Sequence, residues 1–159
     1  MPNESVRLAI MAPNPEFWMP INPDAIKNKK KLIAELQDAH TVLIAAPIYN
    51  FGVPSALKAW IDHVVRMGHT FSHDGQQFAG LVKRPRAVLA LAYGVGGYAD
   101  ALAPMDHLRP YLTQLLTFLG IEHIDAITVE ATTADADTVA AHVGSAEARI
   151  RALFDAASA

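Results

Sequence analysis

The residues best suited to bind a small molecule lie in two short loops, residues 47–51 and 93–98. In the first loop, Tyr49 and Phe51 offer flat rings on either side of Asn50, whose amide both donates and accepts hydrogen bonds. The second loop is rich in glycine, which lets the backbone approach a ligand closely. Rings beside amides suit a planar heteroaromatic ligand, although each loop alone is explained equally well as a turn.

Histidine side chains near these loops are candidates for proton transfer. His69 and His73 have a spacing that would suggest a metal pair on a helix, but Gly68 ends the expected helix first, so no metal site is predicted. His107 opens a helix after the glycine-rich loop, where a histidine can act as an acid or a base. A surface position near a helix cap explains His107 as well, with Asp106 as the partner of the helix dipole.

The composition narrows the class of protein. The 159 residues are 52% hydrophobic and 18% charged, which predicts one domain with a substantial core. A net charge of −3 argues against a nucleic-acid or anionic-membrane partner. The sequence has no cysteine, which excludes disulfides and thiol catalysis, and no apolar run long enough to span a membrane. The N-terminus does not resemble a signal peptide, so we expect a cytoplasmic protein.

Hydrophobic patterning predicts the elements that position the two loops. Strands are expected at residues 6–11, 41–46, 87–91 and 124–129, and helices within 21–40, 54–67, 106–119 and about 134–157. Strands that alternate with helices imply a parallel sheet with helices on both faces. Ligands of such sheets bind at the carboxyl ends of the strands, where both loops lie. Two loops at the same edge favour a binding site.

Two segments of the sequence resemble a known family. PIYNFGVPSALKAWIDHVVRMGHTF resembles the flavin-binding segment of the FMN-dependent NADH azoreductases, in the flavodoxin-like NAD(P)H:quinone oxidoreductase superfamily. MDHLRPYLTQLLTFLGIEHI resembles the helix and strand that follow it. The resemblance implies a homodimer with sites at its interface, in which hydride passes from NAD(P)H to the flavin and then to a quinone or azo compound. It also implies which residues line the flavin: Pro47, Ile48, Tyr49, Asn50, Phe51, Tyr93 and Gly94.

The start of the sequence departs from the family pattern. The family begins with a strand, a serine-rich turn and a helix that binds the FMN phosphate, whereas residues 6–11 resemble its second strand. We therefore expect a truncated flavodoxin-like three-layer sandwich with a mostly parallel sheet of about four strands. Residues 6–11 are expected to pair directly with 41–46 in the vacant place. Loss of three or four phosphate hydrogen bonds, at about 1.5–3 kcal/mol each, would weaken FMN binding by roughly 10³-fold or more.

Three alternatives stay open. The chain could be a flavin-free enzyme that isomerises a double bond of a conjugated molecule, with His69, His107, Tyr49 and Tyr98 as catalytic residues. It could instead be a non-catalytic subunit that forms a heterodimer with a full-length relative. The sequence could also begin late within a longer reading frame, which the DNA upstream of Met1 would show.

Overall fold

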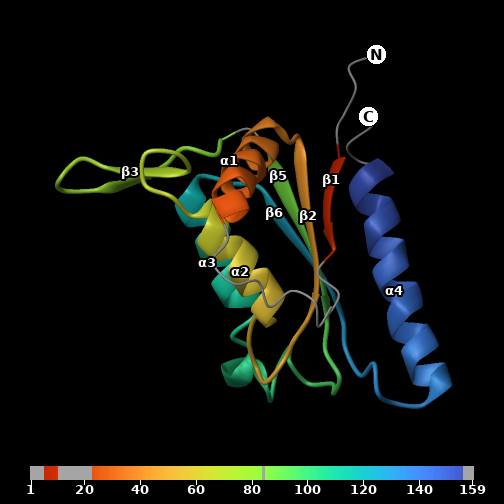
Figure 1. The fold of residues 1–159 in the computed structure, drawn as a ribbon. Coiled ribbons are helices and arrows are strands. Elements are labelled where there is room, and N and C mark those ends of the chain that lie inside the picture. Colours follow the sequence, from red (N-terminus) through yellow and green to blue (C-terminus); the bar gives the residue numbers. More distant parts are fainter. Residues whose placement is uncertain (1–5, 11–22, 84, 156–159) are drawn as a thin grey trace.

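The computed structural model describes residues 6–10, 23–83 and 85–155. A four-stranded parallel sheet, in the order β1-β2-β5-β6, lies between helices α1, α2 and α3 on one face and α4 on the other (Figure 1). This arrangement confirms the expected flavodoxin-like three-layer sandwich. The strands are β1 (Val6–Ile10), β2 (Thr41–Pro47), β3 (Phe71–His73), β4 (Phe78–Gly80), β5 (Arg86–Ala92) and β6 (Ile124–Val129). The helices are α1 (Pro23–Asp38), α2 (Ser55–Val64), α3 (Arg109–Leu119) and α4 (Ala136–Asp155).

The sheet pairs its strands as the sequence predicts. β1 lies parallel to β2, with Val6 opposite Thr41, so the first strand of the chain does occupy the place beside residues 41–46. β2 pairs with β5 over seven residues, from Thr41 opposite Arg86 to Pro47 opposite Ala92. Val88 and Leu89 are both buried although they point to opposite faces, as expected for a strand inside a parallel sheet.

The core is divided between the two faces of the sheet. The larger cluster lies under α1, α2 and α3 and includes Ile44, Leu57, Leu89 and Leu112, all fully buried. Burial of each such side chain contributes roughly 1.5–3 kcal/mol to stability. The smaller cluster lies under α4 around Ile127 and two other buried residues. The face that α4 covers therefore contributes much less to the core.

Helix α2 ends earlier than the sequence predicts. The expected end was near residue 67, before Gly68, but the helix stops at Val64. The buried hydroxyl of Thr70 donates to the Val64 carbonyl at 2.7 Å and accepts from the Arg66 amide at 2.9 Å. These bonds replace the next helical turn.

The hairpin β3–β4 was not predicted. Its strands have three residues each, which is too short for a period-2 pattern to be recognised. Its turn is closed by Asp74, whose Oδ1 accepts from the amides of Gln76 and Gln77 at 2.8 Å each. Of the described helices, none combines the length and the apolar character that a membrane span requires.

The predicted helix over 106–119 begins three residues later than expected. Asp106 lies outside the helix and caps it, because its Oδ1 accepts from the amides of Leu108 and Arg109 at 2.9 and 3.0 Å. Gly120 ends the helix as predicted, in the left-handed conformation with φ 102°. Asp135 caps α4, as expected for the acidic residues at 132–138, by accepting from the Thr138 amide at 3.0 Å.

Candidate functional site

The turn after β2 contains two of the three non-glycine residues with positive φ in the described chain. The Tyr49 amide donates to the Gly52 carbonyl at 3.1 Å, and the Gly52 amide donates back to the Tyr49 carbonyl at 2.9 Å. The two residues between them, Asn50 and Phe51, have φ 46° and 68°. Asparagine tolerates this left-handed region, but a bulky phenylalanine there is an outlier that costs about 1–2 kcal/mol. Strain of this kind is concentrated at functional sites.

The turn presents its aromatic rings on a fixed backbone. Tyr49 is 45% exposed and Phe51 44% exposed. The Ile48 amide donates to the Ala92 carbonyl at 2.9 Å, and the His107 amide donates to the Phe51 carbonyl at 2.9 Å. The turn is therefore anchored to β5 on one side and to the segment before α3 on the other. Two exposed rings held this way form a preorganised surface for stacking a flat molecule.

Helix α2 adds a positive dipole to the same edge. It begins at Ser55, directly after the turn, and its N-cap residue is Pro54. A proline side chain cannot accept from the first-turn amides, and that turn has no acidic residue. The partial positive charge of the helix end can therefore stabilise negative charge that develops on a ligand at this edge.

Tyr93, at the start of the second loop, belongs to the core. It is 1% exposed, and its hydroxyl donates to Oδ2 of Asp106 at 3.0 Å. Burial, followed by the nearby Asp106 carboxylate, raises the pKa of Tyr93 far above its usual value near 10. The centroid of its ring lies 4.7 Å from the centroid of the Tyr98 ring. The Tyr93 side chain therefore stabilises the cap of α3.

Glu130 holds the glycine-rich loop in place. Its Oε2 accepts from the Gly97 amide at 2.7 Å and from the Tyr98 amide at 3.1 Å. The Gly94 carbonyl accepts from the hydroxyl of Thr133 at 2.8 Å. The Gly97 and Tyr98 amides lie in the loop that the sequence analysis offered as a ligand site, but they are bonded within the protein. Sequence reasoning missed Glu130, although a carboxylate directly after a buried strand is a signal that points to it.

The structure brings together most of the predicted site residues. Those at the carboxyl edge of the sheet are Pro47, Ile48, Tyr49, Asn50, Phe51, Tyr93, Gly94, Tyr98 and His107. His69 lies beyond the opposite end of α2, a helix about 15 Å long, and its carbonyl accepts from Gln37 Nε2 of α1 at 2.8 Å. The four proton-transfer candidates are therefore not assembled in one place. Within the described residues, no group of three or more His, Asp or Glu side chains is arranged to hold a metal ion.

Comparison with known proteins identifies the family. A family model described as "Flavodoxin-like fold" matches residues 3–154. The FMN-dependent NADH:quinone oxidoreductase of Xanthobacter autotrophicus is 53% identical over 97 residues, which are 60% of this chain and 47% of that protein. The protein of the same name from Shewanella frigidimarina is 36% identical over 129 residues, which are 81% of this chain and 64% of that protein.

Solved structures share the fold. An FMN-dependent NADH-azoreductase from Bacillus anthracis, in complex with FMN, has a TM-score of 0.72 and 23% identity, with 82% of this chain and 63% of that chain covered. A second azoreductase from Bacillus anthracis has a TM-score of 0.70 and 20% identity, with 77% and 59% covered. The chain spans about half to two thirds of the length of these curated relatives and structures. Since the family model matches nearly all of its residues, the chain belongs to the flavodoxin-like family, as a relative of the FMN-dependent NADH:quinone oxidoreductases.

Proposed function

We propose that this chain binds the isoalloxazine ring of FMN at the carboxyl edge of its sheet and acts as an NAD(P)H-dependent oxidoreductase on planar quinone or azo compounds. The observation that carries the proposal is the strained turn, in which Phe51 keeps φ 68° and an exposed ring. The strained backbone of Phe51 does not improve the packing of the core, because the Phe51 ring is exposed. We therefore assign the strain to a binding role of the ring. The names of the curated relatives support the choice of cofactor and acceptor.

Each residue of the turn has a role in this proposal. Tyr49 and Phe51 stack against the ring system, and the Asn50 amide bonds to its polar edge. Pro47 and Ile48 support the ring where β2 ends, and Gly94 borders it on the β5 side, in front of the buried Tyr93. FMN, when bound, supplies the hydride chemistry. The N-terminus of α2 stabilises negative charge at the same edge.

A flavin titration tests the proposal directly. FMN fluorescence should be quenched on addition of the purified chain, and NADH oxidation with a quinone acceptor should depend on added FMN. Because the proposed contacts go to the ring system, riboflavin should bind with an affinity close to that of FMN. An FMN affinity far above that for riboflavin would mean that the chain also binds the phosphate group. That result would contradict the proposal that the contacts go to the ring system.

Matched aromatic variants locate the site. Tyr49→Ala and Phe51→Ala should each weaken FMN binding about tenfold, since a stacked aromatic pair contributes about 1 kcal/mol or more. Phe78→Ala is the control, because Phe78 is 60% exposed on the β3–β4 hairpin, away from the carboxyl edge. Absence of flavin binding, or an equal loss in the Phe78 variant, would refute the site.

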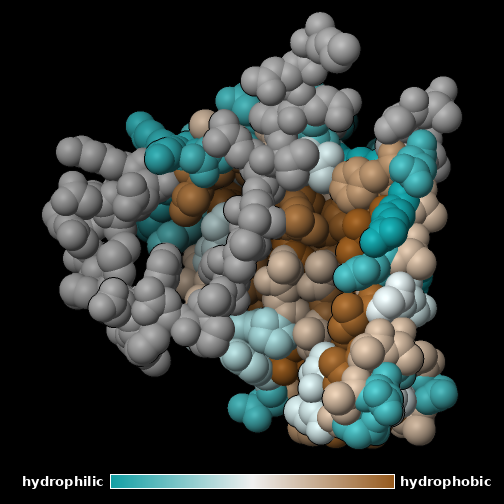
Figure 2. Space-filling view, turned by 90° about the vertical axis from the view of Figure 1, so that its right-hand side faces the viewer, coloured by the Kyte–Doolittle hydropathy of each residue, from teal (hydrophilic) through white to brown (hydrophobic). Residues whose placement is uncertain are grey.

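We also propose that the active form is a homodimer located in the cytoplasm. The α4 side of the sheet supports self-association, because Val143, Ile150 and Phe154 of α4 are exposed. Figure 2 shows apolar surface on this side of the molecule. A parallel sheet is normally covered on both faces, and a second copy would complete this one. Sedimentation that shows a monomer at micromolar concentration would contradict the dimer. The lack of cysteine is consistent with a chain that does not use the disulfides of secreted proteins.

A further inference from the structure

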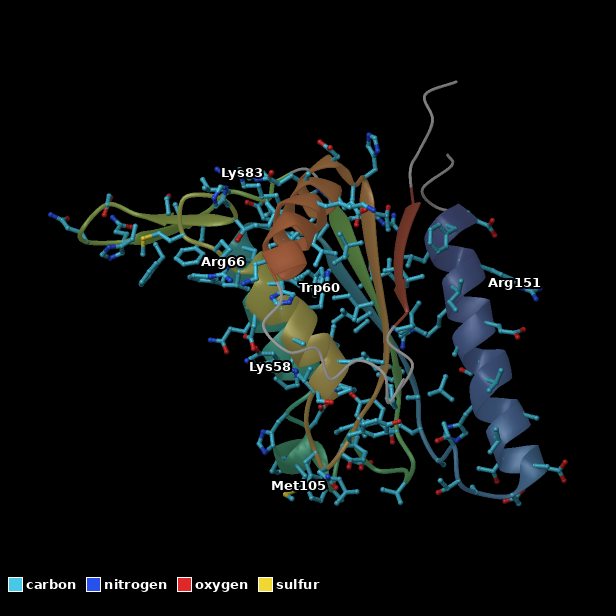
Figure 3. The ribbon with its side chains drawn as sticks, viewed as in Figure 1. Lys58, Trp60, Arg66, Lys83, Met105 and Arg151 are labelled. Atoms are coloured by element: carbon cyan, nitrogen blue, oxygen red, sulfur yellow. The ribbon has the colours of Figure 1, made fainter. Side chains whose placement is uncertain are left out.

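A hollow lies at the amino edge of the sheet, at the opposite end of the strands from the strained turn. It has a volume of about 470 Å³, in the range of small-molecule sites. Its lining is polar and mostly basic and consists of His40, Lys83, Pro85, Arg86, Gly120, Glu122 and His123. Figure 3 shows Lys83 at this end of the molecule and Met105 at the other. We call this hollow the amino-edge cavity.

Three neighbouring strands form the frame of the amino-edge cavity. Arg86 is the first residue of β5, and its amide donates to the carbonyl of His40, just before β2, at 3.0 Å. The next amide, of Ala87, donates to the carbonyl of His123, just before β6, at 2.8 Å. The register of the sheet therefore places Arg86 between the two histidines. This positioning comes from the sheet's own hydrogen bonds, so the backbone holds the three residues side by side before any ligand arrives.

The guanidinium of Arg86 has donors that the described protein does not use. Its Nε and Nη2 atoms are buried and have no hydrogen-bond partner among the described residues. These two nitrogens form one edge of the planar fork, the edge that pairs with both oxygens of a carboxylate or phosphate. The ring of Phe154 packs over the guanidinium, with its centroid 5.3 Å from the central carbon. Buried donors without acceptors are rare in folded proteins, so each one calls for a structural explanation.

Capping of helix α3 does not explain the basic lining. The helix ends at this edge, where a cation often bonds to the last carbonyls. Here backbone amides already occupy those carbonyls: the Gly120 amide donates to Thr117, the Ile121 amide to Leu116 and the Val82 amide to Leu119. The side chains of the amino-edge cavity are therefore not needed to complete the helix.

The charge of the lining favours an anion. Lys83 and Arg86 contribute two positive charges, and Glu122 contributes the one negative charge. The end of α3 adds about half a negative charge, which is less than the two cations provide. His40 and His123 complete the polar lining.

We propose that the amino-edge cavity binds a small molecule through a phosphate or carboxylate group, which accepts the paired donors of Arg86. Lys83 supplies a second cation at the mouth, and Glu122 weakens binding by repulsion. Nε and Nη2 are buried in the unliganded chain. The proposal therefore requires the Arg86 side chain to turn toward the cavity when the anion binds. This site is independent of the flavin site, since it lies at the other edge of the sheet.

Titration of the full chain with inorganic phosphate, and separately with citrate, tests the proposal. The readout is the side-chain Nε–H signal of Arg86 in nitrogen–proton correlation spectra, with calorimetry for the affinity. We expect the Nε–H signal of Arg86 to shift with either anion. The anion that binds more tightly shows whether the cavity prefers a phosphate or a carboxylate group. Arg86→Gln should weaken binding at least about tenfold, because two charge-assisted hydrogen bonds are lost.

Variants of exposed residues keep the test valid if the Arg86 variant is unstable. Lys83→Gln should weaken anion binding about threefold and Glu122→Gln should strengthen it about threefold, from charge alone. Arg151→Gln is the matched control, because Arg151 is exposed on α4 and pairs with Glu147 at 3.6 Å.

No shift of the Arg86 signal with either anion would overturn the proposal. So would Lys83 and Glu122 variants that bind like the unaltered chain. None of these measurements requires FMN, so they stand or fall separately from the oxidoreductase proposal.

Discussion

The two edges of the parallel sheet are built in opposite ways. At the carboxyl edge, the Glu130 carboxylate is bonded to the Gly97 and Tyr98 amides, and the rings of Tyr49 and Phe51 are exposed. At the amino edge, the backbone is bonded within the sheet and the exposed groups are cationic side chains around a hollow. One edge therefore presents aromatic rings, and the other gathers basic side chains around a hollow, among them Arg86 with two buried donors.

This difference means that the two edges suit different ligands. A ring stacked on aromatic side chains gains dispersion and apolar burial, which depend little on salt. An anion held by Arg86 and Lys83 gains charge-assisted hydrogen bonds, which weaken as ionic strength screens the charges. The same fold can therefore carry two sites that respond to different conditions. Substitutions that act on one edge only can separate them.

The largest effect is expected from Gly80→Ala, next to the amino edge. A Cβ on Gly80 would lie 2.3 Å from the backbone nitrogen of Gly120 and from the carbonyl carbon of Leu119. Since the obstacle is backbone, β4 must separate from the end of α3, and we expect a loss of about 3 kcal/mol in the free energy of unfolding. Urea denaturation measures it. Because Gly120 lines the amino-edge cavity, anion binding should fall while flavin binding persists.

Gly144→Ala provides the matched control for this glycine. Gly144 lies in α4, and an added Cβ meets nothing within 4 Å. Alanine should stabilise the helix by about 1 kcal/mol through its higher helix propensity. If both alanine variants changed stability by the same amount, the close approach of Gly80 to Gly120 would not be a feature of the folded protein.

At the carboxyl edge, Glu130→Ala should cost about 2 kcal/mol, because it leaves the amides of Gly97 and Tyr98 without their charged acceptor. Hydrogen exchange of these two amides should accelerate by more than that of the neighbouring strand β5. Glu147→Ala, which removes an exposed carboxylate paired with Arg151, should change stability very little. Unchanged protection of Gly97 in the Glu130 variant would show that the loop is held by other contacts.

Tyr93→Phe should lower the free energy of unfolding by about 1 kcal/mol at neutral pH, because Asp106 loses a partly buried hydrogen bond. The pKa of Tyr93 is raised in the folded state, so the unfolded chain loses this proton first when the pH rises above about 10. Stability of the unaltered chain should therefore fall above that pH, by up to about 1.4 kcal/mol per pH unit. The Tyr93→Phe variant should lack this part of the slope, as a series of alkaline denaturation curves would show.

Tyr49→Phe serves as the control for the lost hydroxyl, because Tyr49 is 45% exposed. It should leave the stability at neutral pH close to that of the unaltered chain. If stability still fell with pH in the same way in the Tyr93→Phe variant, groups other than Tyr93 would be the cause of the alkaline slope.

The smallest effect is expected from a pair of variants at the strained turn. Phe51→Gly and Phe51→Ala both remove the ring, but only glycine adopts φ 68° without strain. The glycine variant should therefore be more stable than the alanine variant by about 1 kcal/mol, while both lose flavin affinity. Equal stabilities in thermal denaturation would mean that the turn does not store strain, and the inference from strain to function would fail.

Sequence patterns predicted the architecture well because the relevant signals are local. The apolar run that became β2, the stop of α3 at Gly120 and the cap of α4 by Asp135 all follow from neighbouring residues. The turn at residues 49–52 was located correctly from its residue types. Its positive φ values were not predicted, because Phe51 ordinarily disfavours that conformation.

The features that sequence reasoning missed depend on contacts between distant segments. The early end of α2 depends on the hydroxyl of Thr70, six residues beyond the last helical residue. The order of the glycine-rich loop depends on Glu130, more than thirty residues away. His69 was grouped with Tyr49 and His107 as a catalytic candidate, yet α2 separates it from that edge. No local periodicity encodes such distances.

The sequence by itself determined the order of strands and helices and their apolar faces, and with them the parallel sheet and the edge at which aromatic rings would lie. These follow from residue types a few positions apart, since helices and strands bury one face at a fixed period. Only the tertiary structure decided that Glu130 would hold the glycine-rich loop and that Arg86 would lie between His40 and His123. The physical reason is strand register, which places side chains from separate segments together and is set by the packing of the whole sheet.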